Sequence, residues 1–95
     1  MGEDGRRAES DDVVATYDEA DGERTLTFER ESGETATIAQ NLDGYAMLAV
    51  RNGDRTGPEL ERYYGFEMAL DHVGEILGVP PSSLPIPPAG ADMGM

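Results

Sequence analysis

The sequence predicts an α+β fold: an antiparallel meander of four to five strands, with one amphipathic C-terminal helix packed on one face and an extended Pro-rich tail. Two observations lead to this class. Apolar and polar residues alternate over the first half of the chain, between Gly-containing turn pairs, and the apolar spacing changes to three and four residues further on. A period of two is typical of half-buried strands, and a period near 3.6 is typical of a helix. Strands followed by a helix indicate the α+β class.

Two alternating stretches predict the first hairpin. In "VVATYDEA" every second residue from Val13 to Tyr17 falls on one face, and in "ERTLTFERE" Leu26 and Phe28 alternate with polar residues. The pair Asp21-Gly22 between them tolerates the positive φ values that a two-residue hairpin turn requires. Later turn pairs, at 32–33 and 43–44, predict a third strand in "ETATIAQNL".

The stretch "YAMLAVR" carries apolar residues on both of its faces. Leu48 and Val50 fall on one side, and Tyr45 and Met47 fall on the other. Such a strand is predicted to be central and covered on both sides. Because one helix cannot cover two faces, the far side would be sheltered by the C-terminal tail or by a second copy of the chain.

The segment "ELERYYGFEMALDHVGEILG" permits two interpretations. Its apolar spacing allows one long helix, with Pro58 in a first turn. Alternatively, the adjacent Tyr63 and Tyr64 favour a strand over 59–64, and a helix follows over 66–77. We favour the second, because a glycine inside a helix, at position 65, costs about 1 kcal/mol. In both interpretations the helix ends at Gly78, the residue type best suited to a left-handed C-terminal conformation.

A chain of 95 residues supports one hydrophobic core and therefore one domain. Residues 1–11 are polar and acidic without periodicity, and predict a flexible N-terminal tail. The single domain is expected over 12–79. Residues 80–95 contain five prolines and predict an extended arm.

The charge is strongly one-sided. Twenty Asp and Glu face seven basic residues, all of them Arg, and the formal net charge is -13. A surface of this kind stays hydrated in concentrated salt, where self-repulsion is screened. Few aliphatic residues combined with high charge would indicate disorder at moderate salt, but their clear periodicity favours a folded domain. The composition therefore predicts a protein adapted to molar salt.

Several function classes lack the residues they need. Without Cys there is no disulfide and no thiolate zinc site, and no segment has the length and apolarity of a signal peptide or membrane span. His72, beside Asp71 and off the apolar stripe of the helix, is the single histidine and is expected to be structural. A recognition helix cannot follow Val79 through so many prolines, and no basic residue lies beyond Arg62. We expect no enzyme activity, cofactor, metal, nucleic acid or membrane partner.

The candidate interaction surface collects apolar and aromatic residues that the predicted fold leaves without cover. Two adjacent tyrosines beside Arg62 could bind a partner or a flat ligand, although alternation would bury one tyrosine and expose the other. On the arm, Leu84 and Ile86 must cover either their own sheet or that of a neighbour. The full set is Tyr45, Met47, Arg62, Tyr63, Tyr64, Leu84 and Ile86.

The segment "ELERYYGFEMALDHVGEILGVPPSSLP" and the ending "ADMGM", on an acidic chain without Lys, resemble a small haloarchaeal family of acidic proteins of unknown function. The resemblance runs from about residue 13 to the end and implies no activity or site residue. We therefore expect a non-enzymatic, cytoplasmic protein-interaction module that binds a partner or itself as a homodimer. The alternative is a small ligand-binding or regulatory module using Arg62, Tyr63 and Tyr64.

Overall fold

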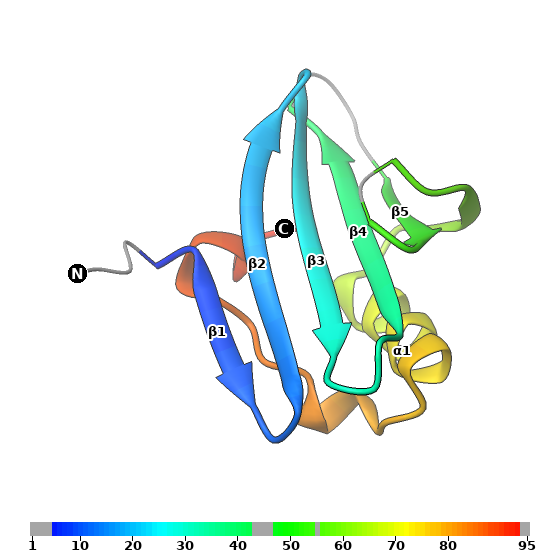
Figure 1. The fold of residues 1–95 in the computed structure, drawn as a ribbon. Coiled ribbons are helices and arrows are strands. Elements are labelled where there is room, and N and C mark those ends of the chain that lie inside the picture. Colours follow the sequence, from blue (N-terminus) through cyan, green and yellow to red (C-terminus); the bar gives the residue numbers. More distant parts are fainter. Residues whose placement is uncertain (1–4, 43–46, 55, 94–95) are drawn as a thin grey trace.

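The computed structural model describes residues 5–42, 47–54 and 56–93. In these ranges the chain forms a six-stranded antiparallel sheet whose strands follow their order in the sequence, one α-helix and two short 3₁₀ helices (Figure 1). The elements are β1 (Arg7–Ser10), β2 (Val13–Ala20), β3 (Glu23–Arg30), β4 (Thr35–Asn41), β5 (Leu48–Asn52), β6 (Glu59–Tyr63), α1 (Phe66–Leu77), η1 (Pro81–Ser83) and η2 (Pro88–Gly90).

The predicted α+β class is confirmed, whereas the prediction of four to five strands is wrong. The additional strand is β1, which occupies residues expected to lie in a flexible tail. β1 pairs with β2 from Arg7 opposite Thr16 to Ser10 opposite Val13. It is a short edge strand in which Ala8 is the one apolar residue. Its alternation is therefore too weak to be read from the sequence.

Local turn chemistry behaves as predicted. Asp21 and Gly22 adopt φ values of 55° and 78°, as a tight hairpin turn requires. The ambiguous segment divides into β6 and α1, so the single long helix is wrong. Gly78 ends α1 with φ 76°, and the amides of Gly78 and Val79 both donate to the Gly74 carbonyl, at 2.8 and 2.9 Å.

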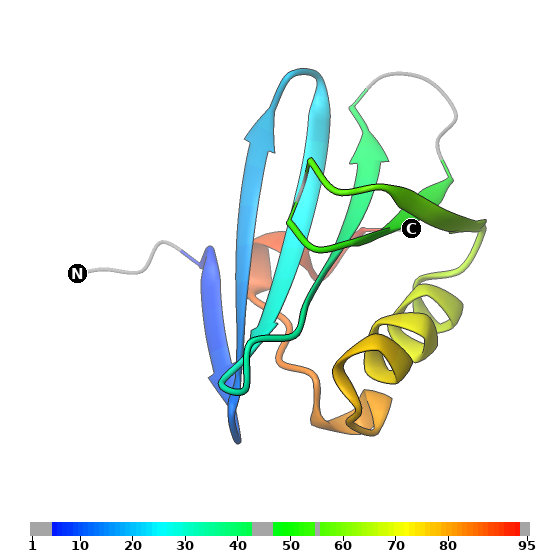
Figure 2. The same cartoon turned by 45° about the vertical axis from the view of Figure 1, so that its right-hand side comes forward.

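The helix and the Pro-rich arm share one side of the sheet. Figures 1 and 2 show α1 over the β4–β6 part, while the arm runs behind the strands nearer β1. Leu84 is 7% exposed and Ile86 is partly buried against the core. Both cover their own sheet, although two 3₁₀ turns interrupt the extended path predicted for the arm.

The core lies between the sheet and this mixed layer. Its largest fully buried members from the sheet are Leu26, Phe28, Ile38 and Leu48, which share one cluster with Val73 and Leu77 of the helix and Met93 of the arm. None of the helices in the described ranges is long and apolar enough to cross a membrane.

The other face of the sheet corrects the expectation that β5 is covered on both sides. β5 is an interior strand, but no second layer lies over its far face in the described part of the chain. The buried residues of that face, called the open face below, have small side chains: Thr25, Thr37, Ala39 and Ala49 are 2, 0, 2 and 6% exposed. Such side chains need little cover, because long polar residues from neighbouring strands extend over them. Tyr45 lies outside the described residues.

Candidate functional site

Three large apolar side chains are exposed where β6 leads into α1. Leu60 is 44% exposed, Tyr64 72% and Met68 54%. They come from the strand, the turn after it and the first turn of the helix. We define residues 59–72 as the β6–α1 corner. Exposed apolar side chains close together indicate an interaction surface more often than scattered single ones do.

Tyr63 and His72 join the strand and the helix at this corner. The Tyr63 side chain packs partly against the core, and its hydroxyl lies 3.0 Å from His72 Nδ1. The two rings meet edge to face, with centroids 5.9 Å apart and an interplanar angle of 89°. Tyr63 therefore turns inward and Tyr64 outward, as the alternation predicted. The contact links β6 to α1 through His72.

The charges at the corner are mostly negative. Arg62 forms a two-pronged contact with Glu59, at 2.6 and 3.1 Å, and this arginine lowers the pKa of the Glu59 carboxyl. In the described ranges no basic side chain pairs with Glu61, Glu67 or Asp71. The corner therefore combines exposed apolar groups with carboxylates that lack a cation.

The hydroxyl of Tyr63 lies near carboxylates from both the strand and the helix. Partial burial raises its pKa above the ordinary tyrosine value, and the negative charges of Glu61, Glu75 and Asp71 raise it further. Strand and helix therefore present acidic groups to the same region of the corner.

A small depression lies beside the corner on the open face of the sheet. Its volume is about 190 Å³, and its floor includes Ala39, Met47 and Ala49. Arg51 closes one side through a two-pronged pair with Glu23, at 2.8 and 3.1 Å. The volume is below the roughly 300–1,000 Å³ typical of small-molecule sites. Both arginines that line it, at 51 and 62, already bind carboxylates.

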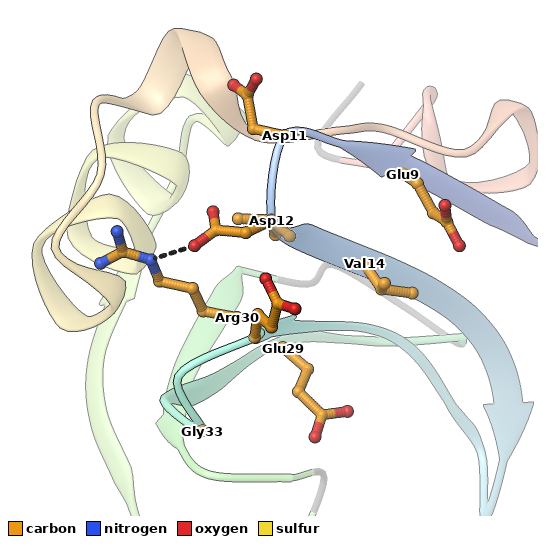
Figure 3. Close-up of a pocket in the computed structure, with 9 residues that line it drawn as sticks. Glu9, Asp11, Asp12, Val14, Glu29, Arg30 and Gly33 are labelled. Atoms are coloured by element: carbon orange, nitrogen blue, oxygen red, sulfur yellow. Dashed lines mark hydrogen bonds and ion pairs between the residues drawn. The ribbon is translucent and has the colours of Figure 1, made fainter.

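A larger depression, of about 340 Å³, lies at the turns that join β1 to β2 and β3 to β4 (Figure 3). Arg30 donates to Asp12 Oδ2 at 2.9 Å and to the Leu77 carbonyl at 2.8 Å, so it links the first turn of the sheet to the C-terminal end of α1. A cation at a helix C-terminus is favourable. The other charged residues that line this depression are acidic: Glu9, Asp11, Glu29 and Glu31. Among the described residues, no group of three or more His, Asp or Glu could hold a metal ion.

The predicted surface residues do not form one patch. Tyr64 and the Glu59-paired Arg62 lie at the corner, Met47 lines the small depression, and Tyr63 points inward. Leu84 and Ile86 belong to the covered face. The sequence interpretation missed Leu60 and Met68 as exposed residues. Leu60 lies where the pairing of β5 with β6 is irregular, at Val50/Arg51. The spacing of Leu60 from the next apolar residues therefore did not indicate that its side chain is exposed. Met68 lies off the apolar stripe of the helix, and that position in the sequence could have indicated that its side chain is exposed.

Comparison with known protein families assigns the chain to one of them. A model of a family of unknown function (DUF7111) matches residues 7–95, from the first strand through the arm. No match is found among curated proteins or among solved structures. The chain belongs to the DUF7111 family, and the resemblance to a family of unknown function is thereby confirmed.

Proposed function

We propose that this member of the DUF7111 family is a non-enzymatic protein-interaction module that acts through the β6–α1 corner. The supporting observation is the grouping of exposed apolar side chains. Among the described residues the large exposed apolar side chains are Leu42, Leu60, Tyr64 and Met68, and three of these lie within residues 60–68. On a chain with a net charge of -13, such a grouping is best explained by a contact surface.

The edge of the sheet supports the same proposal. In the described part of the chain β6 pairs with β5 and with no other strand. Its outer side therefore presents backbone N–H and C=O groups next to the exposed side chains. Unpaired strand edges are common sites of association with another chain.

The use of the polar side chains supports a non-enzymatic role without nucleic-acid partners. His72 is occupied by the Tyr63 hydroxyl. The described arginines all contact carboxylates: Arg6 with Asp18, Arg7 with Glu9, Arg24 with Asp92, Arg30 with Asp12, Arg51 with Glu23 and Arg62 with Glu59. Nucleic-acid binding depends on basic groups directed toward phosphates.

We further propose that the module works in the salt-rich cytoplasm of a halophilic archaeon. Support comes from the charge of -13 and from the use of Arg alone as the basic residue type. At about 1 M salt the Debye length falls to about 3 Å, so repulsion between surface carboxylates that are not directly opposed is largely screened.

Affinity capture from the native host with matched bait variants tests the interaction proposal. The first bait carries Leu60→Gln with Tyr64→Ser, and the control carries Leu42→Gln, at a residue that is 52% exposed, follows β4 and lies outside residues 59–72. We expect a partner that the wild type and the control retain and the double variant loses. Identical capture by all three would refute the proposal. Sizing of the purified chain identifies the case in which the retained partner is a second copy.

A further inference from the structure

We propose that the β6–α1 corner binds an extended, alternating apolar and basic segment of another protein, which adds to the sheet as a further strand beside β6. This inference rests on the proposed interaction function and specifies its partner. The observations that carry it are the open edge of β6, the exposed apolar side chains around it and the unpaired carboxylates beside them.

The edge provides backbone recognition. In an antiparallel pair, alternate residues direct their N–H and C=O groups toward the neighbouring strand, and the remaining residues direct theirs outward. β6 is paired on the β5 side, so its outward groups are available to an added strand. Strand addition obtains affinity from such main-chain bonds and specificity from side chains on either face. Leu60 on the strand and Tyr64 just after it would contact apolar residues of the added segment.

The charge determines which segment fits. Glu61 lies on the strand, and Glu67 and Asp71 lie on the helix, all exposed and without a basic partner in the described ranges. Consistent with this, the negative charges of Glu61 on the strand and Asp71 on the helix both raise the pKa of the Tyr63 hydroxyl. Lysine or arginine side chains of an incoming strand would pair with them, and an acidic strand would be repelled.

A second copy of the chain fits this edge poorly. Residues directly opposite each other in an antiparallel pair share a face, so a symmetric pair of β6 strands must be centred on one residue. Centring on Glu61 or Arg62 places that residue against its own copy. Centring on Leu60 places Glu59 against Glu61 twice. Like charges directly opposite each other are destabilising. The symmetric registers centred on Leu60, Glu61 and Arg62 are therefore all unfavourable.

Peptide titration of the isotope-labelled full chain, followed by NMR, tests the inference. The probe is a blocked peptide of about eight residues in which valine alternates with lysine, long enough to pair along β6. A second peptide keeps the lysines and replaces the central valines with proline, which cannot supply ladder hydrogen bonds. A third carries glutamate in place of lysine. We expect the first peptide alone to shift the amide signals of residues 59–64 in a saturable manner.

Charge-matched variants separate specific binding from general attraction to an acidic protein. Glu61→Lys with Glu67→Lys should weaken binding of the first peptide roughly ten-fold or more, because the paired charges are reversed. Glu29→Lys with Glu31→Lys changes the net charge equally, at exposed residues at the end of β3, three strands away from β6, and should have a much smaller effect.

Three results would overturn strand addition by a basic segment: equal affinity for the proline peptide, equal weakening by both pairs of variants, or a peptide-free dimer whose contacts map to β6. If the capture experiment still identifies a partner that depends on Leu60 and Tyr64, the interaction function stands and only the partner chemistry is wrong. If capture is unaffected by those variants, the proposed function itself fails.

Discussion

Met93→Ala tests whether the C-terminal arm is part of the hydrophobic core. Met93 is 1% exposed and belongs to the cluster that joins sheet, helix and arm. Truncating a buried methionine removes its transfer free energy and leaves a cavity, which together cost about 2–5 kcal/mol. We expect a loss of about 3 kcal/mol in the free energy of unfolding, within this range. A domain of this size loses roughly 4–8 °C in Tm per kcal/mol, so the melting temperature should fall by about 12–24 °C.

The matched control is Met68→Ala, the same chemical change at a residue that is 54% exposed. Its free energy of unfolding should stay within about 0.5 kcal/mol of the wild type. Both variants are unfolded with urea at one fixed salt concentration, with far-UV circular dichroism as the signal. Equal midpoints for Met93→Ala and the wild type, at unchanged slope, would refute the packing of the arm on the sheet.

Four further changes have defined outcomes. Gly78→Ala forces a Cβ into a left-handed conformation, at φ 76°, and should cost about 1–2 kcal/mol in urea unfolding. Arg24→Met removes the donors to Tyr17 Oη at 2.7 Å and to the Ala89 carbonyl at 3.2 Å, so we expect a loss of about 2 kcal/mol and faster proteolysis within the arm. Burial raises the pKa values of Tyr17 and Tyr63 above 10.0, so the unfolded state loses these hydroxyl protons at lower pH than the folded state does. Urea midpoints should therefore fall as pH rises above about 10, and unchanged midpoints would contradict this. Lowering KCl from about 1 M to about 0.05 M should reduce the Tm through carboxylate repulsion, and an unchanged Tm in dilute buffer would contradict halophilic adaptation.

The sequence predicted those features whose cause is local. The Asp21-Gly22 turn and the Gly78 helix end depend on backbone conformations that few residue types tolerate, so residue identity alone indicates them. Strand β1 escaped prediction because its stability comes from pairing with β2, while its own four residues carry almost no apolar pattern. An edge strand of this kind is formed by its neighbour's register more than by its own sequence.

The path of the arm had no local cause. Alternation shows that Leu84 and Ile86 need cover or provide it, but it does not show which face of the sheet they reach. That choice depends on contacts distant in the sequence. The amide of Ala89 donates to the Gly5 carbonyl at 2.7 Å, and Arg24 donates to the Ala89 carbonyl and pairs with Asp92. A chain with 20 carboxylates offers too many possible partners for any one such pair to be predicted.

The open face of the sheet explains why association is expected at an edge. Arg51 on β5 reaches Glu23 on β3, so this ion pair passes across β4, whose Ala39 lies between the paired strands. The side chains of Arg51 and Glu23 are only 18 and 24% exposed, which shows that they lie down against the sheet. Thr27 and Thr37 add a cross-strand contact at 3.2 Å on the same face. Covering this face with a partner would desolvate the ion pair while burying few apolar atoms, an exchange that gains little free energy. At the β6–α1 corner the exposed groups are instead large and apolar, so contact there removes more apolar surface from water for each polar group buried.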